Sequence, residues 1–206
     1  MSIFTELESC TPLPISADGF NPQATLPYEL EIGHLRSAMN DFVDFLGFIN
    51  NQLHFKQMIR LEKMLMPANF SSIVGEFMTA SIPKYCQALV KNRYHNGHPD
   101  LIPTSAFIND AVQHSGSGIE VKASRYLRGW QGHNPEEIWL MVFVFDCNRP
   151  VDVATRPFRF IKVVGAQLTR SDWLFSGRST TSRRTITASV TETGYTNMMA
   201  NWIYKS

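Results

Sequence analysis

The chain has 206 residues, of which 44% are hydrophobic and 18% charged, and its formal net charge is +1. A chain of this length can bury a sizeable core in one domain, and no stretch approaches the roughly 18 consecutive apolar residues that indicate a membrane-spanning helix. The first residues lack the basic and apolar regions of a secretory signal. We therefore expect a single cytoplasmic domain, residues 1–206, with no membrane segment.

The cysteines indicate the same compartment. Cys10, Cys86 and Cys147 are odd in number, far apart and without a Cys-x-x-Cys pair. This pattern predicts neither a disulfide framework nor a thiolate zinc site. We expect buried or incidental thiols.

Residues 1–66 are predicted to form an arm followed by helices. Residues 9–28 contain four prolines and a glycine, which is typical of an extended segment. Between residues 27 and 66 the apolar residues recur at helical spacing, which predicts one or two amphipathic helices. We expect their aromatic stripe to face the core or a dimer interface.

A further helix is predicted after Pro67. Residues 69–72 offer an N-cap for a helix with apolar residues at 73, 74, 77 and 78, and Glu76 lies on it. Pro83 is expected to interrupt or restart the helix before residues 85–91.

Two acids and a lysine then follow predicted turns. Asp100 comes after the turn dipeptide at 96–97, and Glu120 and Lys122 come after the turn sequence at 115–118. In a strand, Glu120 and Lys122 point to one face and their apolar neighbours to the other. Consecutive elements would bring the three side chains together. The plain alternative is an acid in a turn and a solvated Glu/Lys pair.

Phosphodiester hydrolysis needs side chains of these types. Divalent cations are held by carboxylate oxygens, which Asp100 and Glu120 can supply. A lysine beside the second carboxylate can hold the attacking water and offset negative charge on the phosphate in the transition state, and Lys122 has that position.

The string Pro99-Asp100 followed by Glu120-Val121-Lys122 resembles the motif of the PD-(D/E)XK nuclease superfamily. Its flanking pattern over roughly residues 70–146 is most like type II restriction endonucleases. The resemblance implies Mg²⁺ as cofactor, bound by Asp100 and Glu120, with Lys122 as catalytic lysine. It also implies that Glu76 is a further catalytic acid and metal ligand on the preceding helix.

The remaining pattern predicts the fold class. Residues 138–145 form a continuous apolar run, typical of a strand buried on both faces, and residues 158–168 predict another strand. We expect an α/β (α+β) fold with a mixed central sheet flanked by helices. The resemblance implies that residues 67–168 form a restriction-endonuclease-like catalytic core. The N-terminal arm and helices, residues 1–66, would precede it, and a β-rich DNA-recognition region, residues 169–206, would follow it.

The charge distribution suggests where DNA docks. Residues 1–55 carry seven acids and one base, whereas residues 156–206 carry eight bases and two acids. A phosphate backbone is expected on the C-terminal quarter, with a merely solvated basic surface as the alternative. Arginines and hydroxyls contact phosphates and base edges; the candidates are Arg125, Gln131, His133, Asn134, Arg178, Ser179, Thr180, Arg183 and Arg184.

The predicted function is Mg²⁺-dependent, sequence-specific cleavage of double-stranded DNA by a type II restriction endonuclease. A homodimer is expected because cutting both strands of a palindrome needs two active sites, and a cognate DNA methyltransferase would be its genetic partner. A structure-selective repair or junction nuclease and a catalytically silent DNA-binding protein are the alternatives. His95, His98 and His133 offer a different metal chemistry, an HNH-type or zinc site, but the rest of those signatures is missing.

Overall fold

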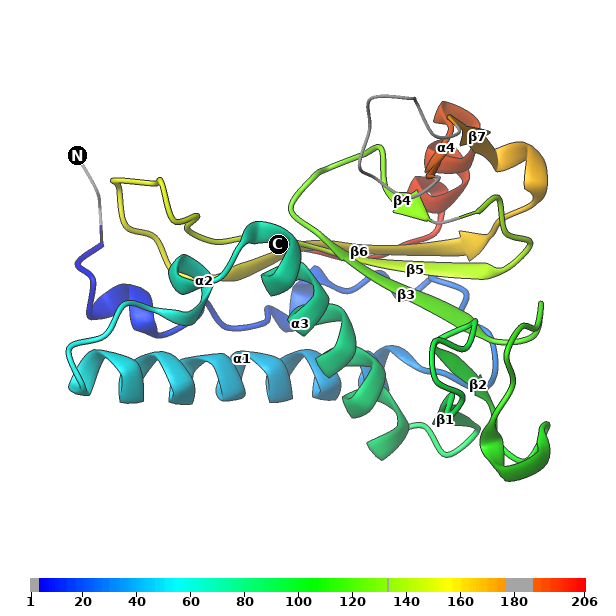
Figure 1. The fold of residues 1–206 in the computed structure, drawn as a ribbon, viewed down its shortest axis with the longest axis horizontal. Coiled ribbons are helices and arrows are strands. Elements are labelled where there is room, and N and C mark those ends of the chain that lie inside the picture. Colours follow the sequence, from blue (N-terminus) through cyan, green and yellow to red (C-terminus); the bar gives the residue numbers. More distant parts are fainter. Residues whose placement is uncertain (1–3, 133, 177–186) are drawn as a thin grey trace.

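A mixed six-stranded sheet forms the centre of the computed structural model, which describes residues 4–132, 134–176 and 187–206 (Figure 1). The strand order is β1-β2-β3-β5-β6-β9. β3 and β5 are parallel and the other neighbours are antiparallel. The strands are β1 Leu89–Lys91, β2 Leu101–Pro103, β3 Ile119–Ser124, β5 Trp139–Asp146, β6 Arg159–Gln167 and β9 Trp202–Lys205. The prediction of a mixed central sheet with helices is confirmed.

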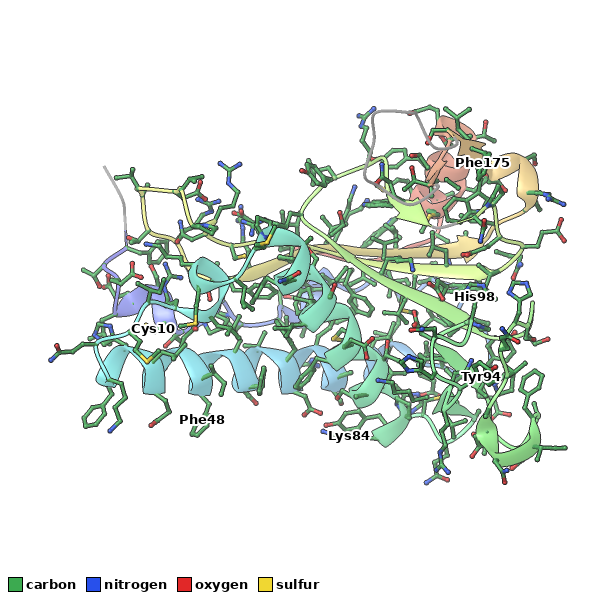
Figure 2. All side chains as sticks on the ribbon, viewed as in Figure 1. Cys10, Phe48, Lys84, Tyr94, His98 and Phe175 are labelled. Carbon is green, nitrogen blue, oxygen red and sulfur yellow. The ribbon has the colours of Figure 1, made fainter. Side chains whose placement is uncertain are left out.

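Helices α1 (Ile32–Phe55) and α3 (Pro67–Ser81) cover one face of this sheet, with the single turn α2 (Leu61–Met64) between them in sequence (Figure 1). The buried residues of α1 recur at helical spacing and meet alternate residues of β5 in one apolar cluster. Phe42 packs against Phe160, with ring centroids 5.8 Å apart. Phe48 points away from the sheet (Figure 2) and is 63% exposed.

The opposite face carries a smaller sheet and a helix. Among the described residues this sheet has the order β4-β8-β7, formed by Gln131–Gly132, Ala188–Val190 and Trp173–Phe175. Helix α4 (Glu192–Ala200), which the sequence pattern did not predict, starts after Thr191, whose side chain accepts a hydrogen bond from the N–H of Gly194. These elements enclose a second apolar cluster with the other alternate residues of β5. β5 is therefore buried on both faces, as its continuous apolar sequence predicts.

Two predicted boundaries are wrong. Helix α3 begins at Pro67 with Met66 as N-cap, not at residue 69, because proline is well tolerated at the first helical position. Residues 85–91 do not form a helix: after a 3-10 turn at Ile82–Lys84 the chain enters strand β1. Pairing of β1 with β2 and burial of Leu89 in the core override the local helical pattern.

The N-terminal arm runs along the sheet. The N–H of Leu13 donates to the carbonyl of Phe158, and that of Asn21 donates to the carbonyl of Ile203. The short 3-10 turns Glu8–Cys10 and Ala17–Gly19 interrupt the arm, and two others, Ile108–Asp110 and Arg170–Asp172, lie in later loops. Within the described ranges, the three cysteines are buried free thiols, and no helix is long and apolar enough to cross a membrane.

Two polar networks fix the helices. Arg60 is 1% exposed, and its guanidinium pairs with the fully buried Glu62 at 2.6 Å and with Glu6 at 3.0 Å, while it also donates to Asn148. This network joins the N-terminus, α2 and the loop after β5.

Asp41 makes the second network. Its carboxylate on α1 accepts hydrogen bonds from Ser81, Lys84 and Tyr85, at 2.6, 3.0 and 2.8 Å. Partial burial would raise the pKa of Asp41, but these three donors outweigh it and lower the pKa below its usual range. The bonds join the middle of α1 to the end of α3 and the turn that follows.

Candidate active site

A cleft of about 1040 Å³ opens at the end of the sheet where β2 and β3 diverge. It is bordered by α3, by the segment that leads into β2, by β3 and by the loop before β5. All four predicted catalytic residues line it, namely Glu76, Asp100, Glu120 and Lys122.

Asp100 lies immediately before β2 and is held by the backbone of β3. The register pairs Leu101 with Ile119; continued by two residues, it would set Pro99 against Val121, so that the N–H of Val121 would donate to the carbonyl of Pro99. That carbonyl accepts from the Asn92 side chain, and the N–H of Val121 donates to Oδ2 of Asp100, with 2.8 Å between N and O. The carboxylate thus takes the place of a strand carbonyl and is fixed against β3.

Gly118 permits this close approach. Its φ is +141°, and a Cβ atom there would lie 2.2 Å from the carbonyl oxygen of Leu101, so a side chain does not fit without displacing the backbone. The N–H of Gly118 also donates to the hydroxyl of Tyr28 at 2.7 Å. The N-terminal arm therefore supports the turn that leads into β3.

Asn92 holds the segment that carries Asp100. The side chain is 8% exposed and donates to the carbonyls of Pro99 and Val112 at 3.0 and 2.8 Å. Its Oδ1 accepts from the N–H groups of Tyr94 and Val112, and its own backbone N–H donates to the carbonyl of Asp100. The sequence reasoning did not identify this positioning residue.

Glu120 and Lys122 share one face of β3, as the alternation predicts. Ile119 and Val121 are buried in the core on the helix side. The Lys122 ammonium contacts Oε1 of Glu120. Glu120 is 6% exposed, whereas the Lys122 side chain is half-buried at the cleft wall. The alternative of a fully solvated Glu/Lys pair is therefore wrong.

The pKa values of the two carboxyls of this site, Asp100 and Glu120, are shifted in opposite directions. Burial and the nearby charge of Glu120 raise the pKa of Asp100 to about 7. Burial would also raise the pKa of Glu120, but the hydrogen bond from His98 and the charge of Lys122 outweigh it and lower the pKa to about 2. Burial would lower the pKa of Lys122, but the charges of Glu120 and Asp100 raise it. At neutral pH the ion pair is complete and Asp100 is only partly ionised.

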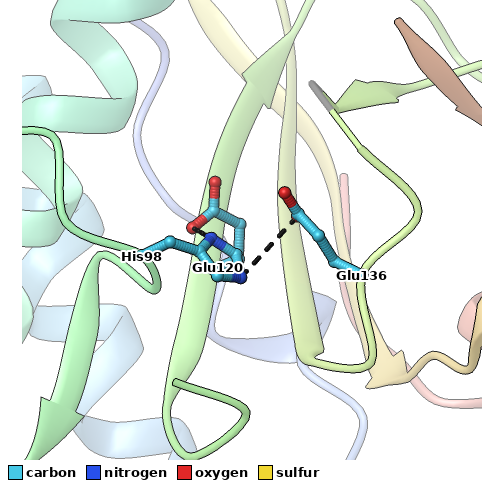
Figure 3. A group of neighbouring side chains, drawn as sticks. All are labelled: His98, Glu120 and Glu136. Carbon is cyan, nitrogen blue, oxygen red and sulfur yellow. Dashed lines mark ion pairs between the residues drawn. The ribbon is translucent and has the colours of Figure 1, made fainter. Parts of the chain in front are cut away.

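His98 and Glu136 complete the cluster and were not among the predicted catalytic residues (Figure 3). Nδ1 of His98 lies 2.9 Å from Oε2 of Glu120, and Nε2 lies 3.8 Å from Oε2 of Glu136. The His98 ring stacks on His114 with centroids 5.2 Å apart. Backbone hydrogen bonds to Gln113 and Ser115 hold its main chain. Burial would lower the pKa of His98, but the hydrogen bond to Glu120 and its charge raise it.

Glu76 lies on α3 at the rim of the cleft. Its carboxylate is 2.7 Å from the ammonium of Lys91 and its side chain is 68% exposed. Glu76 thus lies at the same cleft as Asp100 and Glu120, but its carboxylate pairs with Lys91. The predicted helix position is confirmed, and its role stays a prediction.

A second cleft, of about 1130 Å³, continues from the first. Both are lined by Ser71, Lys122 and Ala123. The predicted DNA-binding residues Arg125 and Gln131 line the second cleft, and Asn134 lines the first. The Arg125 guanidinium donates to the backbone carbonyls of Cys147 and Asn148. Arg128, Arg149 and Arg156 also line this cleft.

Several predicted DNA contacts fall outside the described residues: His133, Arg178, Ser179, Thr180, Arg183 and Arg184. Two other bases of the C-terminal quarter are not free surface charges. Arg156 pairs with Asp146 and Asp152, and Lys162 is 7% exposed and lies against the rings of Trp130 and Tyr195. The formal charge of residues 156–206 therefore overstates the charge that they offer to a phosphate backbone.

The histidine alternative is supported only at one position. His95 and His98 line the same cleft, but the metal-ligand cluster that the described residues form contains His98 with two glutamates, not a second histidine or a cysteine. Comparison of the chain with models of protein families, with curated proteins and with solved structures found no match.

Proposed function

We propose that the protein is a Mg²⁺-dependent, sequence-specific endonuclease of the type II restriction class. One observation carries the proposal: Asp100, Glu120 and Lys122 line one cleft, with the Lys122 ammonium against Glu120 and the Asp100 carboxylate bound to the backbone of the same strand. The three groups come from two neighbouring strands, in the order that the Pro-Asp and Glu-x-Lys motif requires. A restriction-endonuclease-like core is part of the same proposal.

The donor set fits a hard divalent cation. Asp100 and Glu120 offer carboxylate oxygens, the ligands that Mg²⁺ prefers, and burial together with the negative charge of Glu120 raises the pKa of Asp100. A bound cation would supply Lewis-acid stabilisation of the phosphate. Asp100 and Glu120 would hold it, and Glu76 would add an oxygen once released from Lys91.

Lys122 would act directly on the reacting groups. Its ammonium can orient the attacking water and offset the negative charge that develops on the phosphate. To do so, the ammonium would have to move away from Oε1 of Glu120. That oxygen would then be available as a ligand for the cation. The backbone N–H of Val121 keeps Asp100 oriented throughout.

The continuous second cleft supports a path for the DNA strand. Arg125 and Arg128 lie along it beyond Lys122, and the exposed Tyr126 lies between them in sequence. Phosphates on one side of the scissile bond would contact these arginines. The described part of the chain thus supports a docking surface beside β3.

Cutting both strands of double-stranded DNA at one site would need two active sites, so the proposal includes a homodimer. A DNA methyltransferase would be its genetic partner. The N-terminal helices are the proposed interface. Phe48 and Phe55 on α1, with Met58 and Ile59 after it, are large apolar side chains exposed on this chain. A two-fold axis there would cover them.

Digestion of linear, supercoiled and branched DNAs with Mg²⁺ tests the proposal. Discrete bands from linear DNA support site-specific cleavage, selective cutting of branched DNA supports a repair or junction nuclease, and a gel shift without cleavage supports a silent DNA-binding protein. Glu120→Gln and Lys122→Ala should abolish cleavage but keep DNA binding. Glu137→Gln, which removes the exposed acid next to Glu136, is the matched control. Undiminished cleavage by either active-site variant would refute the assignment.

A further inference from the structure

The two oxygens of Glu120 face different partners. Oε1 contacts the Lys122 ammonium, and Oε2 lies 2.9 Å from Nδ1 of His98. The carboxylate therefore lies between the Asp100–Lys122 side of the cleft and a second polar group formed by His98 and Glu136 (Figure 3).

The second group has the geometry of a ligand set. One ligand atom each from His98, Glu120 and Glu136 lies within 4.8 Å of the others. Ligands at 2.0–2.2 Å from one ion are separated by about 3–4.4 Å. Glu120 and Glu136 face different ring nitrogens of His98, and one ion binds one of these nitrogens, so one carboxylate has to rotate toward the nitrogen that the other faces. The side chains are 16%, 7% and 11% exposed. Backbone hydrogen bonds hold the segment that carries His98, and strand pairing holds β3, which carries Glu120.

The charges of the cleft also favour a second cation. Asp100, Glu120 and Glu136 place three carboxyls along the described lining of the cleft, beside the ammonium of Lys122. Glu76 pairs with Lys91. Carboxylates gathered among largely buried groups favour a counterion.

We propose that His98, Glu120 and Glu136 form a second cation position, which takes a divalent transition ion. Imidazole nitrogen suits ions such as Fe²⁺ and Zn²⁺, whereas carboxylates also accept Mn²⁺, which serves as the probe. The inference rests on the proposed function through Glu120, whose carboxylate would bridge this position and the Asp100 position. Glu136 and His98 are then metal ligands, and His114 is a positioning residue that holds the His98 ring.

The experiment counts bound ions. The chelator-treated protein is titrated with Mn²⁺ alone, and free Mn²⁺ is followed by electron paramagnetic resonance. The wild type should bind two ions per chain, Glu136→Gln and His98→Asn one each, and Glu137→Gln two. Pulsed measurements should show nitrogen coupling to bound Mn²⁺ in the wild type and not in His98→Asn. Circular dichroism verifies folding, and Glu136→Gln carries the test alone if His98→Asn does not fold.

Two bound ions in Glu136→Gln, or a single ion without nitrogen coupling in the wild type, would overturn the second position. A parallel digestion of plasmid DNA tests the nuclease proposal independently of the number of bound ions. Cleavage by a wild type that binds one ion would refute the second position alone. Two bound ions without cleavage would support the second position and refute the nuclease.

Discussion

Replacement of Asp100 by asparagine should stabilise the metal-free protein. In the folded chain, burial and the charge of Glu120 raise the pKa of Asp100 from 3.8 to about 7. A difference of about three units corresponds to roughly 4 kcal/mol against folding once the group is ionised in both states. Asparagine keeps the oxygen that accepts from Val121, and we expect a gain of about 2–4 kcal/mol at pH 8 because part of the shift is shared with Glu120.

The pH dependence gives the sign of this effect. A carboxyl with a raised folded pKa does not penalise folding below its unfolded pKa, and the penalty grows as the pH rises from about 4 to about 7. The advantage of Asp100→Asn should therefore reach about 40% of its full value at pH 5 and be nearly complete at pH 8. In a chain of this length it corresponds to a rise in Tm of about 5–15 °C at the higher pH.

Urea unfolding in a chelator at pH 5 and pH 8 measures this difference, with Glu137→Gln as control. Added Mg²⁺ should then raise the unfolding free energy of the wild type more than that of Asp100→Asn, because binding to the folded state alone stabilises it. Equal gains at both pH values, or no gain at pH 8, would refute the electrostatic reasoning. Equal stabilisation of the variant and the wild type by Mg²⁺ would refute Asp100 as a ligand.

Three other changes test the site and the fold. Lys122→Met should tighten Mg²⁺ binding at least about tenfold in a calorimetric titration, because the ammonium beside Glu120 competes with the cation; weaker binding would contradict this. Arg60→Met should lower the urea unfolding free energy by about 3–5 kcal/mol, since it leaves the buried Glu62 unpaired, and a loss below about 1 kcal/mol would be inconsistent with a buried pair. Asp41→Asn should cost about 1–2 kcal/mol at pH 7; because the folded pKa is lowered, the difference should shrink as the pH falls below 3.8, and a constant difference would argue against the ionised form.

The sequence predicted those parts of the site that depend on local geometry. The two-residue period of a strand places Glu120 and Lys122 on one face whatever the rest of the chain does. The apolar run of β5 likewise requires burial on both faces. The Pro-Asp pair could be placed beside β3 because β2 and β3 follow one another along the chain, and such strands often pair.

Glu136 could not be found in this way. It lies sixteen residues after Glu120 in sequence, and it enters the cleft because β5 runs parallel to β3, with Trp139 opposite Ile119. That pairing sets the residues before β5 beside the start of β3, and no local pattern specifies it. His98 was visible beside the Pro-Asp pair, but its contact with Glu120 depends on the same tertiary arrangement. The sequence also does not show how the bases of the C-terminal quarter are paired: Arg156 pairs with Asp146, and Lys162 lies against Trp130.

The topology explains why a polar cleft forms at this place. Where β2 leaves β3 after one register pair, backbone groups on both strands lose their strand partners and must be satisfied otherwise. The carbonyl of Pro99 accepts from Asn92 and the N–H of Val121 donates to Asp100. Side-chain polar groups are therefore needed at the divergence, and one of them is a carboxylate that must face Glu120. The bonds that complete the backbone thus hold Asp100 toward Glu120, where the proposed cation would bind.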